Sequence, residues 1–104
     1  MATAQRAPQA VPTVTQLAPA RPNPFRGTAT VAFDLAQAGP VGLRIYAVDG
    51  RKVRTLVEGV RPAGAYTLAW DGRDDRGRGL AAGVYYLRLV TGQGRFTRAL
   101  TLLK

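Results

Sequence analysis

The chain has 104 residues, of which 46% are hydrophobic and 20% charged, a balance typical of one globular domain with a single core. It contains no Ser, His or Cys, which excludes the usual nucleophile–base arrangements, the usual zinc, haem and iron–sulfur sites, and a disulfide framework. The net charge of +9 suggests an anionic partner, although charge alone is non-specific evidence. We expect no enzyme, no cofactor and no metal site.

Residues 1–20 are rich in Ala, Pro and Thr, and Pro8, Pro12 and Pro19 interrupt them. This composition predicts a linker or tail, with a possible short edge strand at Thr13–Leu17. The segment has no apolar stretch of the kind that forms a secretory signal, and no run in the chain is long enough for a transmembrane helix. If the domain is exported, we expect its signal on a longer precursor.

The domain, residues 21–104, begins at the motif RPNPF. From there turn signals recur about every 8–12 residues with short apolar runs between them, which predicts a β-sandwich or a small barrel. We count six strong strands and one weaker strand, and no helical period. Pro22 and Pro24 favour extended geometry around them, and we expect Phe25 to plug one end of the sandwich.

Strand alternation identifies the side chains that face the core. Apolar residues occupy every second position in TATVAFDLA, VGLRIYAV, RPAGAYTLAW and GVYYLRLV. The predicted inward positions are Val31, Phe33, Leu35, Leu43, Ile45, Tyr66, Leu68, Trp70, Tyr85, Leu87 and Leu89. Outward positions are predicted for four arginines that lie among apolar neighbours: Arg44, Arg54, Arg88 and Arg98.

Turn residues separate these strands. We predict a turn at Gly39–Pro40, a type I′ hairpin at Asp49–Gly50, where both central residues need positive φ, and a hairpin framed by Gly92–Gly94. The last strand is expected to run to the chain end. Its alternation is imperfect because Leu102 and Leu103 are adjacent, which predicts a bulge or burial on both sides.

The segment WDGRDDRGRGL, with its loop at Asp71–Gly79, has two interpretations. An EF-hand loop needs acids at positions 1, 3 and 5, Gly at 6 and Glu at 12. Counted from Asp71, Arg73 takes the third place, Gly77 falls one place late and no Glu follows. A structural corner, in which aspartates accept backbone N–H groups, is therefore favoured over a calcium site.

The remaining charge and aromatic patterns point only weakly to ligands. The arginines are spread along the chain, without a basic helix or a cluster interleaved with aromatic residues, so nucleic-acid binding is not favoured. Tyr46 and Tyr86 have the parity of outward positions, and two exposed tyrosines would be a weak signal for carbohydrate binding.

Four motifs in order carry a resemblance to a known family. They are PNPF, LRIYAVDGRKVRTL, AGAYTLAWDGRDDRGRGLAAGVYYLRL and the terminal TRALTLLK. In this order they resemble the type A C-terminal sorting domain of the type IX secretion system, and they are similar to the related Ig-like domain of the flagellar hook-capping protein. The resemblance covers about residues 20–104. It implies an all-β, Ig-like or fibronectin-III-like antiparallel β-sandwich of about seven strands.

The resemblance also implies a role and partners. Domains of this family direct a larger exported protein, fused on the N-terminal side, from the periplasm through the outer membrane to the cell surface. The implied partners are the outer-membrane secretion machinery, a surface peptidase that removes the domain, and an anionic surface glycan to which the cargo is joined. By position, the implied sorting motif is Asn23, Pro24, Phe25, Asp49, Gly50, Arg51, Lys52, Gly83, Val84, Tyr85 and the final strand to Lys104.

A second class of function stays open. The chain could be an extracellular Ig-like structural or binding module, such as an assembly domain of the hook-cap kind or a glycan-binding accessory domain.

Overall fold

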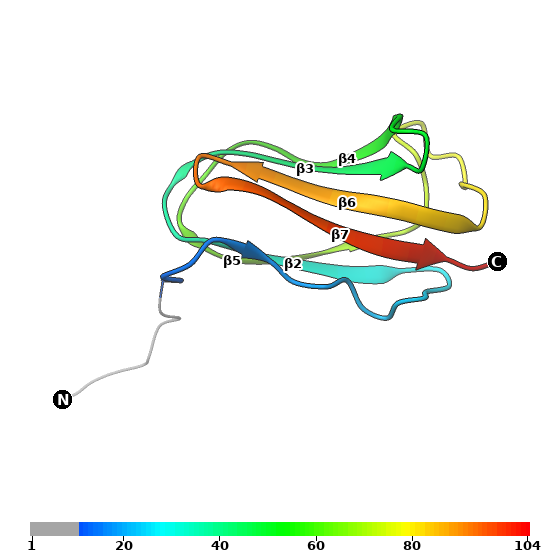
Figure 1. The fold of residues 1–104 in the computed structure, drawn as a ribbon, viewed down its shortest axis with the longest axis horizontal. Coiled ribbons are helices and arrows are strands. Elements are labelled where there is room, and N and C mark those ends of the chain that lie inside the picture. The colour runs from blue at the N-terminus through cyan, green and yellow to red at the C-terminus, as the bar shows by residue number, and fades with distance from the viewer. Residues whose placement is uncertain (1–10) are drawn as a thin grey trace.

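Seven strands form two antiparallel sheets that face each other (Figure 1). The computed structural model describes residues 11–104, and they contain no helix of the length and apolar character that a membrane span requires. The three-stranded sheet has the order β1 (Gln16–Leu17), β2 (Ala29–Leu35), β5 (Gly64–Trp70). The four-stranded sheet has the order β4 (Lys52–Arg61), β3 (Gly39–Ala47), β6 (Gly83–Thr91), β7 (Gly94–Leu102). The predicted all-β sandwich is confirmed.

The alternating apolar side chains fill the space between the sheets, as predicted. The buried predicted positions are Val31, Phe33, Leu35, Leu43, Ile45, Trp70, Tyr85, Leu87 and Leu89. Full burial of such a side chain contributes about 1.5–3 kcal/mol. Tyr66 and Leu68 also pack against the core but are only partly buried, because β5 is an edge strand of the smaller sheet.

Trp70 lies at the centre of an aromatic cluster that closes one end of the core. Its side chain is 0% exposed. The ring centroid of Phe25 lies 5.5 Å from that of Trp70, and Tyr85 meets Trp70 edge-on at 5.6 Å. Such geometries are favourable beyond the area they bury. The prediction that Phe25 plugs an end of the sandwich is confirmed.

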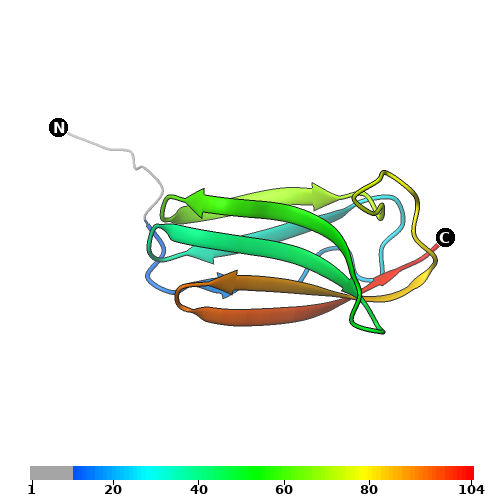
Figure 2. The same ribbon diagram turned by 90° about the horizontal axis from the view of Figure 1, so that it is seen from above.

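The connections between strands divide over two ends of the sandwich (Figures 1 and 2). We call one the loop end, and it is made of segments 22–28, 48–51, 71–82 and 103–104. The opposite end, which we call the β1 end, carries the connections 36–38, 62–63 and 92–93. Since β1 pairs with Phe33 and Asp34, it lies toward the finish of β2 at the β1 end.

Two of the predicted turns differ from the structure. Gly39 and Pro40 are the first residues of β3, where a proline is tolerated at the start of a strand. At the next hairpin only Gly50 has positive φ, at 89°, and its N–H donates to the carbonyl of Ala47. This is a type I turn followed by a glycine bulge, so the predicted type I′ turn at Asp49–Gly50 is wrong.

The last strand is regular rather than bulged. Its register with β6 is continuous from Gly94 to Leu102, where the strand ends, two residues short of the predicted end. Leu102 is buried and Leu103 is half-buried, and the N–H of Leu103 donates to the carbonyl of Phe25 in the segment beside β7. The adjacent leucines therefore reflect burial on both sides.

Two of the four arginines predicted to point outward lie on the inner side instead. Arg54 pairs with the fully buried Ile45, after a β-bulge that changes the parity of β4. Arg98 lies on the same side of β7 as Leu100 and donates to the carbonyl of Leu17 at 2.9 Å. Both are on edge strands, where a long cationic side chain reaches the rim while its strand faces the core.

The segment before residue 21 contributes to the packing. Part of the expected edge strand is present as β1. Thr15, Leu17 and Ala20 are buried, and the Thr15 hydroxyl donates to Gln93 and accepts the N–H of Ala36. Residues 1–10 of the predicted linker lie outside the described residues.

Candidate functional site

The structure brings the residues of the implied sorting motif together at the loop end (Figures 1 and 2). They come from the segment before β2, from the β3–β4 hairpin, from the start of β6 and from the chain end. They are Asn23, Pro24, Phe25, Asp49, Gly50, Arg51, Lys52, Gly83, Val84, Tyr85 and Lys104. Their side chains nevertheless divide into a buried set and an exposed set.

Asn23 and Phe25 fasten the edge of the last strand. The Asn23 amide donates to the carbonyl of Ala99, and its side-chain oxygen accepts the N–H of Thr101. The backbone of Phe25 continues the pairing, because its N–H donates to the carbonyl of Thr101. These bonds satisfy edge groups of β7 that would otherwise be available to another strand. The two residues therefore hold the end of the sandwich together.

Tyr85 is the second buried member of the motif. Its ring packs on Trp70, and its hydroxyl donates to the carbonyl of Ala81 at 2.6 Å. Burial raises the pKa of this hydroxyl above its ordinary value of 10.0. Its neighbour Val84 points the other way and is 39% exposed. Gly83–Tyr85 thus offers one exposed apolar side chain at the loop end.

The β3–β4 hairpin supplies cationic side chains. The Asp49 carboxylate accepts the N–H of Arg51 at 3.0 Å and so stabilises the turn. Arg51 and Lys52 are exposed. Lys104 is also exposed at this end, and its carbonyl accepts a bond from Arg26.

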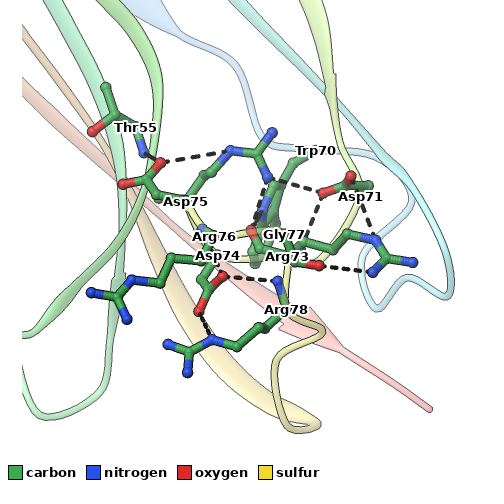
Figure 3. Close-up of polar contacts among 10 residues, drawn as sticks. Thr55, Trp70, Asp71, Arg73, Asp74, Asp75, Arg76, Gly77 and Arg78 are labelled. Carbon is green, nitrogen blue, oxygen red and sulfur yellow. Dashed lines mark hydrogen bonds and ion pairs between the residues drawn. The ribbon is translucent and has the colours of Figure 1, made fainter.

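The Asp71–Gly79 loop is a hydrogen-bonded corner, as Figure 3 shows. Asp74 accepts the N–H groups of Arg76 and Arg78, each at 2.9 Å. The other carboxylate oxygen of Asp74 accepts the Arg78 side chain at 3.1 Å. Asp75 accepts the N–H of Thr55 at 2.9 Å, which ties the loop to β4.

In two acids of this loop, Asp71 and Asp74, the surroundings favour the charged form. The hydrogen bond from the Arg78 N–H lowers the pKa of Asp74 below its ordinary value of 3.8, with smaller contributions from the N–H of Arg76 and the Arg78 side chain. For Asp71, burial acts to raise the pKa, but hydrogen bonds from Arg73 and Arg54 outweigh it, and the pKa is lowered.

Arg54 is the residue of this site that sequence reasoning missed. Its guanidinium donates to Asp71 at 3.1 Å and to the carbonyl of Arg73 at 2.9 Å. The same carbonyl accepts the indole N–H of Trp70 at 3.0 Å. Arg54 therefore links the edge of one sheet to the aromatic core through the loop. Only the bulge in β4, which the amino-acid sequence does not reveal, turns the Arg54 side chain toward the loop.

This arrangement favours the structural corner over a calcium site. Each carboxylate of the loop is engaged by arginine side chains or backbone N–H groups rather than directed at a shared centre. Among residues 11–104 no group of three or more metal-ligating side chains occurs. A calcium ion needs six to eight oxygen ligands, and the intervening guanidinium groups would repel it.

Tyr46 and Tyr86 lie directly opposite each other on the outer face of the four-stranded sheet. Tyr86 is 39% exposed. The guanidinium of Arg88 lies 5.0 Å from the centre of the Tyr46 ring, an arrangement typical of a cation–π contact. One ring of the expected sugar platform is thus covered by the protein's own cation.

Three solved structures show the same fold. FlgD from Xanthomonas campestris, described as a hook-capping protein essential for flagellar assembly, is 27% identical, covers 88% of this chain and has a TM-score of 0.54. PorU from Porphyromonas gingivalis, in a dimeric latent form, is 23% identical over 86% of the chain, with a TM-score of 0.67. PorZ from the same organism, a surface component of the type IX secretion system, is 18% identical over 85%, with a TM-score of 0.59.

This chain spans 63% of that FlgD chain, but only 9% of PorU and 11% of PorZ. It therefore corresponds to one module of the larger proteins. No curated protein sequence matches it. The family model of the FlgD Ig-like domain matches residues 20–95, which is most of the described fold and includes β2 to β6. The predicted Ig-like sandwich is confirmed, and the chain belongs to the FlgD Ig-like domain family.

Proposed function

We propose that this domain is a non-catalytic sorting and anchoring module that directs a larger exported protein through the outer membrane to the cell surface. The observation that carries the proposal is that the three loop segments of the motif and the end of β7 gather at the loop end, opposite the end near which β1 enters the sandwich. A passenger fused ahead of β1 would leave the loop end free to meet the secretion machinery.

The motif residues take two roles in this proposal. Asn23, Phe25 and Tyr85 stabilise the structure of the loop end. Arg51, Lys52 and Val84 are exposed beside them and form the surface that a partner reads. The expected partners are the outer-membrane machinery and a surface peptidase. Anchoring at the bacterial surface follows from the same role.

The description of one solved neighbour supports the link to secretion. PorZ is a surface component of the type IX secretion system, and PorU shares the fold with a TM-score of 0.67. Their identities of 18% and 23% support a common fold. The order of sequence motifs supports the specific role.

A reporter protein with a periplasmic signal, fused ahead of residues 11–104, tests this proposal. In a host that has the type IX system, we expect the reporter at the cell surface, accessible to added protease. In the same host without the outer-membrane translocon, we expect it in the periplasm. A reporter that stays periplasmic in both hosts overturns the proposal.

An assembly module of the hook-cap kind is the second candidate. The family match over residues 20–95 and the 27% identity to a hook-capping FlgD favour it. A chain of this kind would give no surface reporter in either host. It would instead form defined oligomers or bind a filament protein, which size-exclusion chromatography with light scattering would detect.

A further inference from the structure

The outer edge of β5 (Gly64–Trp70) carries backbone groups that no residue between 11 and 104 uses. β5 is the last strand of the three-stranded sheet and pairs with β2 on its other side. The carbonyl of Ala32 and both backbone groups of Thr30 bond to the segment that precedes β2, so they point away from β5. Their register partners are Thr67 and Ala69. In an antiparallel pair these partners then direct their own N–H and C=O groups to the free edge.

The other edges of the two sheets, among the residues that the structure describes, are protected against pairing. β1 has only 2 residues. On β4 the register with β3 is broken by bulges, and Asp75 bonds to the backbone of Val53 and of Thr55. Asn23 and Phe25 cover part of the edge of β7. β5, by contrast, has 7 residues, no proline and no charged side chain. A strand edge without these protective features is open to pairing with another strand.

The sequence of β5 fits a second copy of itself. Around Thr67 it reads Ala-Tyr-Thr-Leu-Ala. An antiparallel pairing with a two-fold axis at Thr67 places Thr67 opposite Thr67 and Ala65 opposite Ala69. These are the residues whose backbone groups point to the free edge, because direction alternates along the strand, and each such pair can exchange two hydrogen bonds. A shift of the register by one residue would instead oppose free groups with groups already bonded to β2.

The side chains of β5 suit the same register. Tyr66 and Leu68 face the core but are only partly buried, and the Tyr66 ring is stacked on Phe33 with the centroids 4.9 Å apart. In the two-fold pair, Tyr66 of each copy lies opposite Leu68 of the other, at a position where cross-strand side chains are closest. Pairing would therefore cover two apolar side chains per copy that the monomer leaves partly in water.

We propose that two copies of this chain associate through β5 and form one continuous sheet in the order β1-β2-β5-β5-β2-β1. The net charge of +9 opposes association, but none of this charge lies on β5. Added salt should therefore strengthen the dimer, because it screens the repulsion between the copies and leaves the backbone and apolar contacts in place. The pairing uses the side of the sandwich rather than the motif residues of the loop end, so it goes beyond the proposed function.

Sedimentation equilibrium of the full chain, between about 1 μM and about 1 mM, tests the proposal. We expect a mass that rises from one chain toward two, and at lower concentration in high salt. Thr67→Pro removes the outward N–H and should weaken the dimer about tenfold or more. It should keep the circular dichroism spectrum of the parent, because proline is tolerated on an edge strand whose N–H faces solvent. Thr67→Lys places two cations opposite each other and should weaken the dimer to a similar extent.

Thr97→Lys is the matched control, since it adds the same charge at an exposed threonine on β7, an edge strand of the other sheet. We expect its dimer dissociation constant to stay within about twofold to threefold of the parent value. A chain that remains monomeric at about 1 mM in high salt would overturn the proposal. A dimer that survives Thr67→Pro, or that Thr97→Lys weakens as much as Thr67→Lys does, would also overturn it. The reporter assay measures surface delivery rather than mass, so failure of this pairing is distinct from failure of the sorting role.

Discussion

The Arg54 guanidinium lies 3.1 Å from the Asp71 carboxylate, and this pair joins the edge of one sheet to the end of the other. Arg54 is on β4 in the four-stranded sheet, and Asp71 directly follows β5 in the three-stranded sheet. Asp71 also accepts the N–H of Arg73 at 3.1 Å, which bends the loop back over the rim. The long connection from β5 to β6 is thus fixed at its first turn.

Replacing Arg54 by Ala should destabilise the domain by about 1–2 kcal/mol. The ion pair is half-exposed and contributes little, whereas the bond to the Arg73 carbonyl and the covered aliphatic stem contribute more. Urea unfolding measures the free energy. Arg76→Ala is the control and should change stability by less than about 0.5 kcal/mol. Equal effects of the two substitutions would show that Arg54 does not fasten the loop.

Phe25→Ala should cost about 3–5 kcal/mol, because it opens a cavity beside Trp70 in the closed end of the core. Under the proposed sorting role, surface delivery of a fused reporter would then be lost through unfolding rather than through a missing contact. Lys104→Ala, at the same end and exposed, should leave the unfolding free energy within about 0.5 kcal/mol of the parent. A Phe25→Ala chain as stable as the parent would disprove the structural role given to this residue.

The lowered pKa of Asp74 predicts how stability depends on acid. Because the folded chain binds this proton less readily than the unfolded chain, the contribution is fully present above about pH 3.8 and is lost as pH falls through the folded pKa. Asp74→Asn should therefore lower Tm at neutral pH and flatten the fall in Tm between about pH 5 and pH 2. A variant whose Tm falls as steeply with acid as that of the parent would contradict the hydrogen-bonded, charged state of Asp74.

The alternation of apolar residues was sufficient to predict the central strands. β2, β3 and β6 each lie between two other strands of their sheets, so position along the strand decides burial. Phe33, Ile45 and Leu87 illustrate this, since all three were expected to be inward and are buried. The burial of Trp70 and Phe25 was predictable for a similar reason. Both are large apolar rings beside turn signals, and such rings pack at the end of the core.

The edge strands were less predictable, for physical reasons that particular residues show. Arg54 follows a bulge that reverses the alternation of inward and outward side chains in β4. No residue of the segment KVRTLV indicates this bulge. Arg98 can face inward because it lies at the rim of the sandwich, where its guanidinium donates to the carbonyl of Leu17. The turn at Asp49–Gly50 needs positive φ at one residue only. An Asp-Gly pair is compatible both with a type I′ turn and with a type I turn followed by a glycine bulge.

The candidate site was predictable as a set of segments but not as a surface. The motif gave the positions, and only the three-dimensional arrangement separates buried Tyr85 from exposed Val84. Which cations at the loop end lack partners depends on two ion pairs, the local Asp74–Arg78 pair and the Arg54–Asp71 pair between residues 17 apart in the sequence.

The most direct measurement is the fraction of a fused reporter that reaches the cell surface when either end of the sandwich is altered. The loop-end variant carries Arg51→Ala, Lys52→Ala and Val84→Ala. The matched β1-end variant carries Arg61→Ala, Arg95→Ala and Val60→Ala, which removes a half-buried arginine, an exposed arginine and an exposed valine. With both variants folded, the account predicts that surface reporter falls at least about tenfold for the first, a loss of roughly 1.4 kcal/mol in recognition, and stays at the parent level for the second. Equal secretion of the two variants, or a loss confined to the β1-end variant, would contradict it.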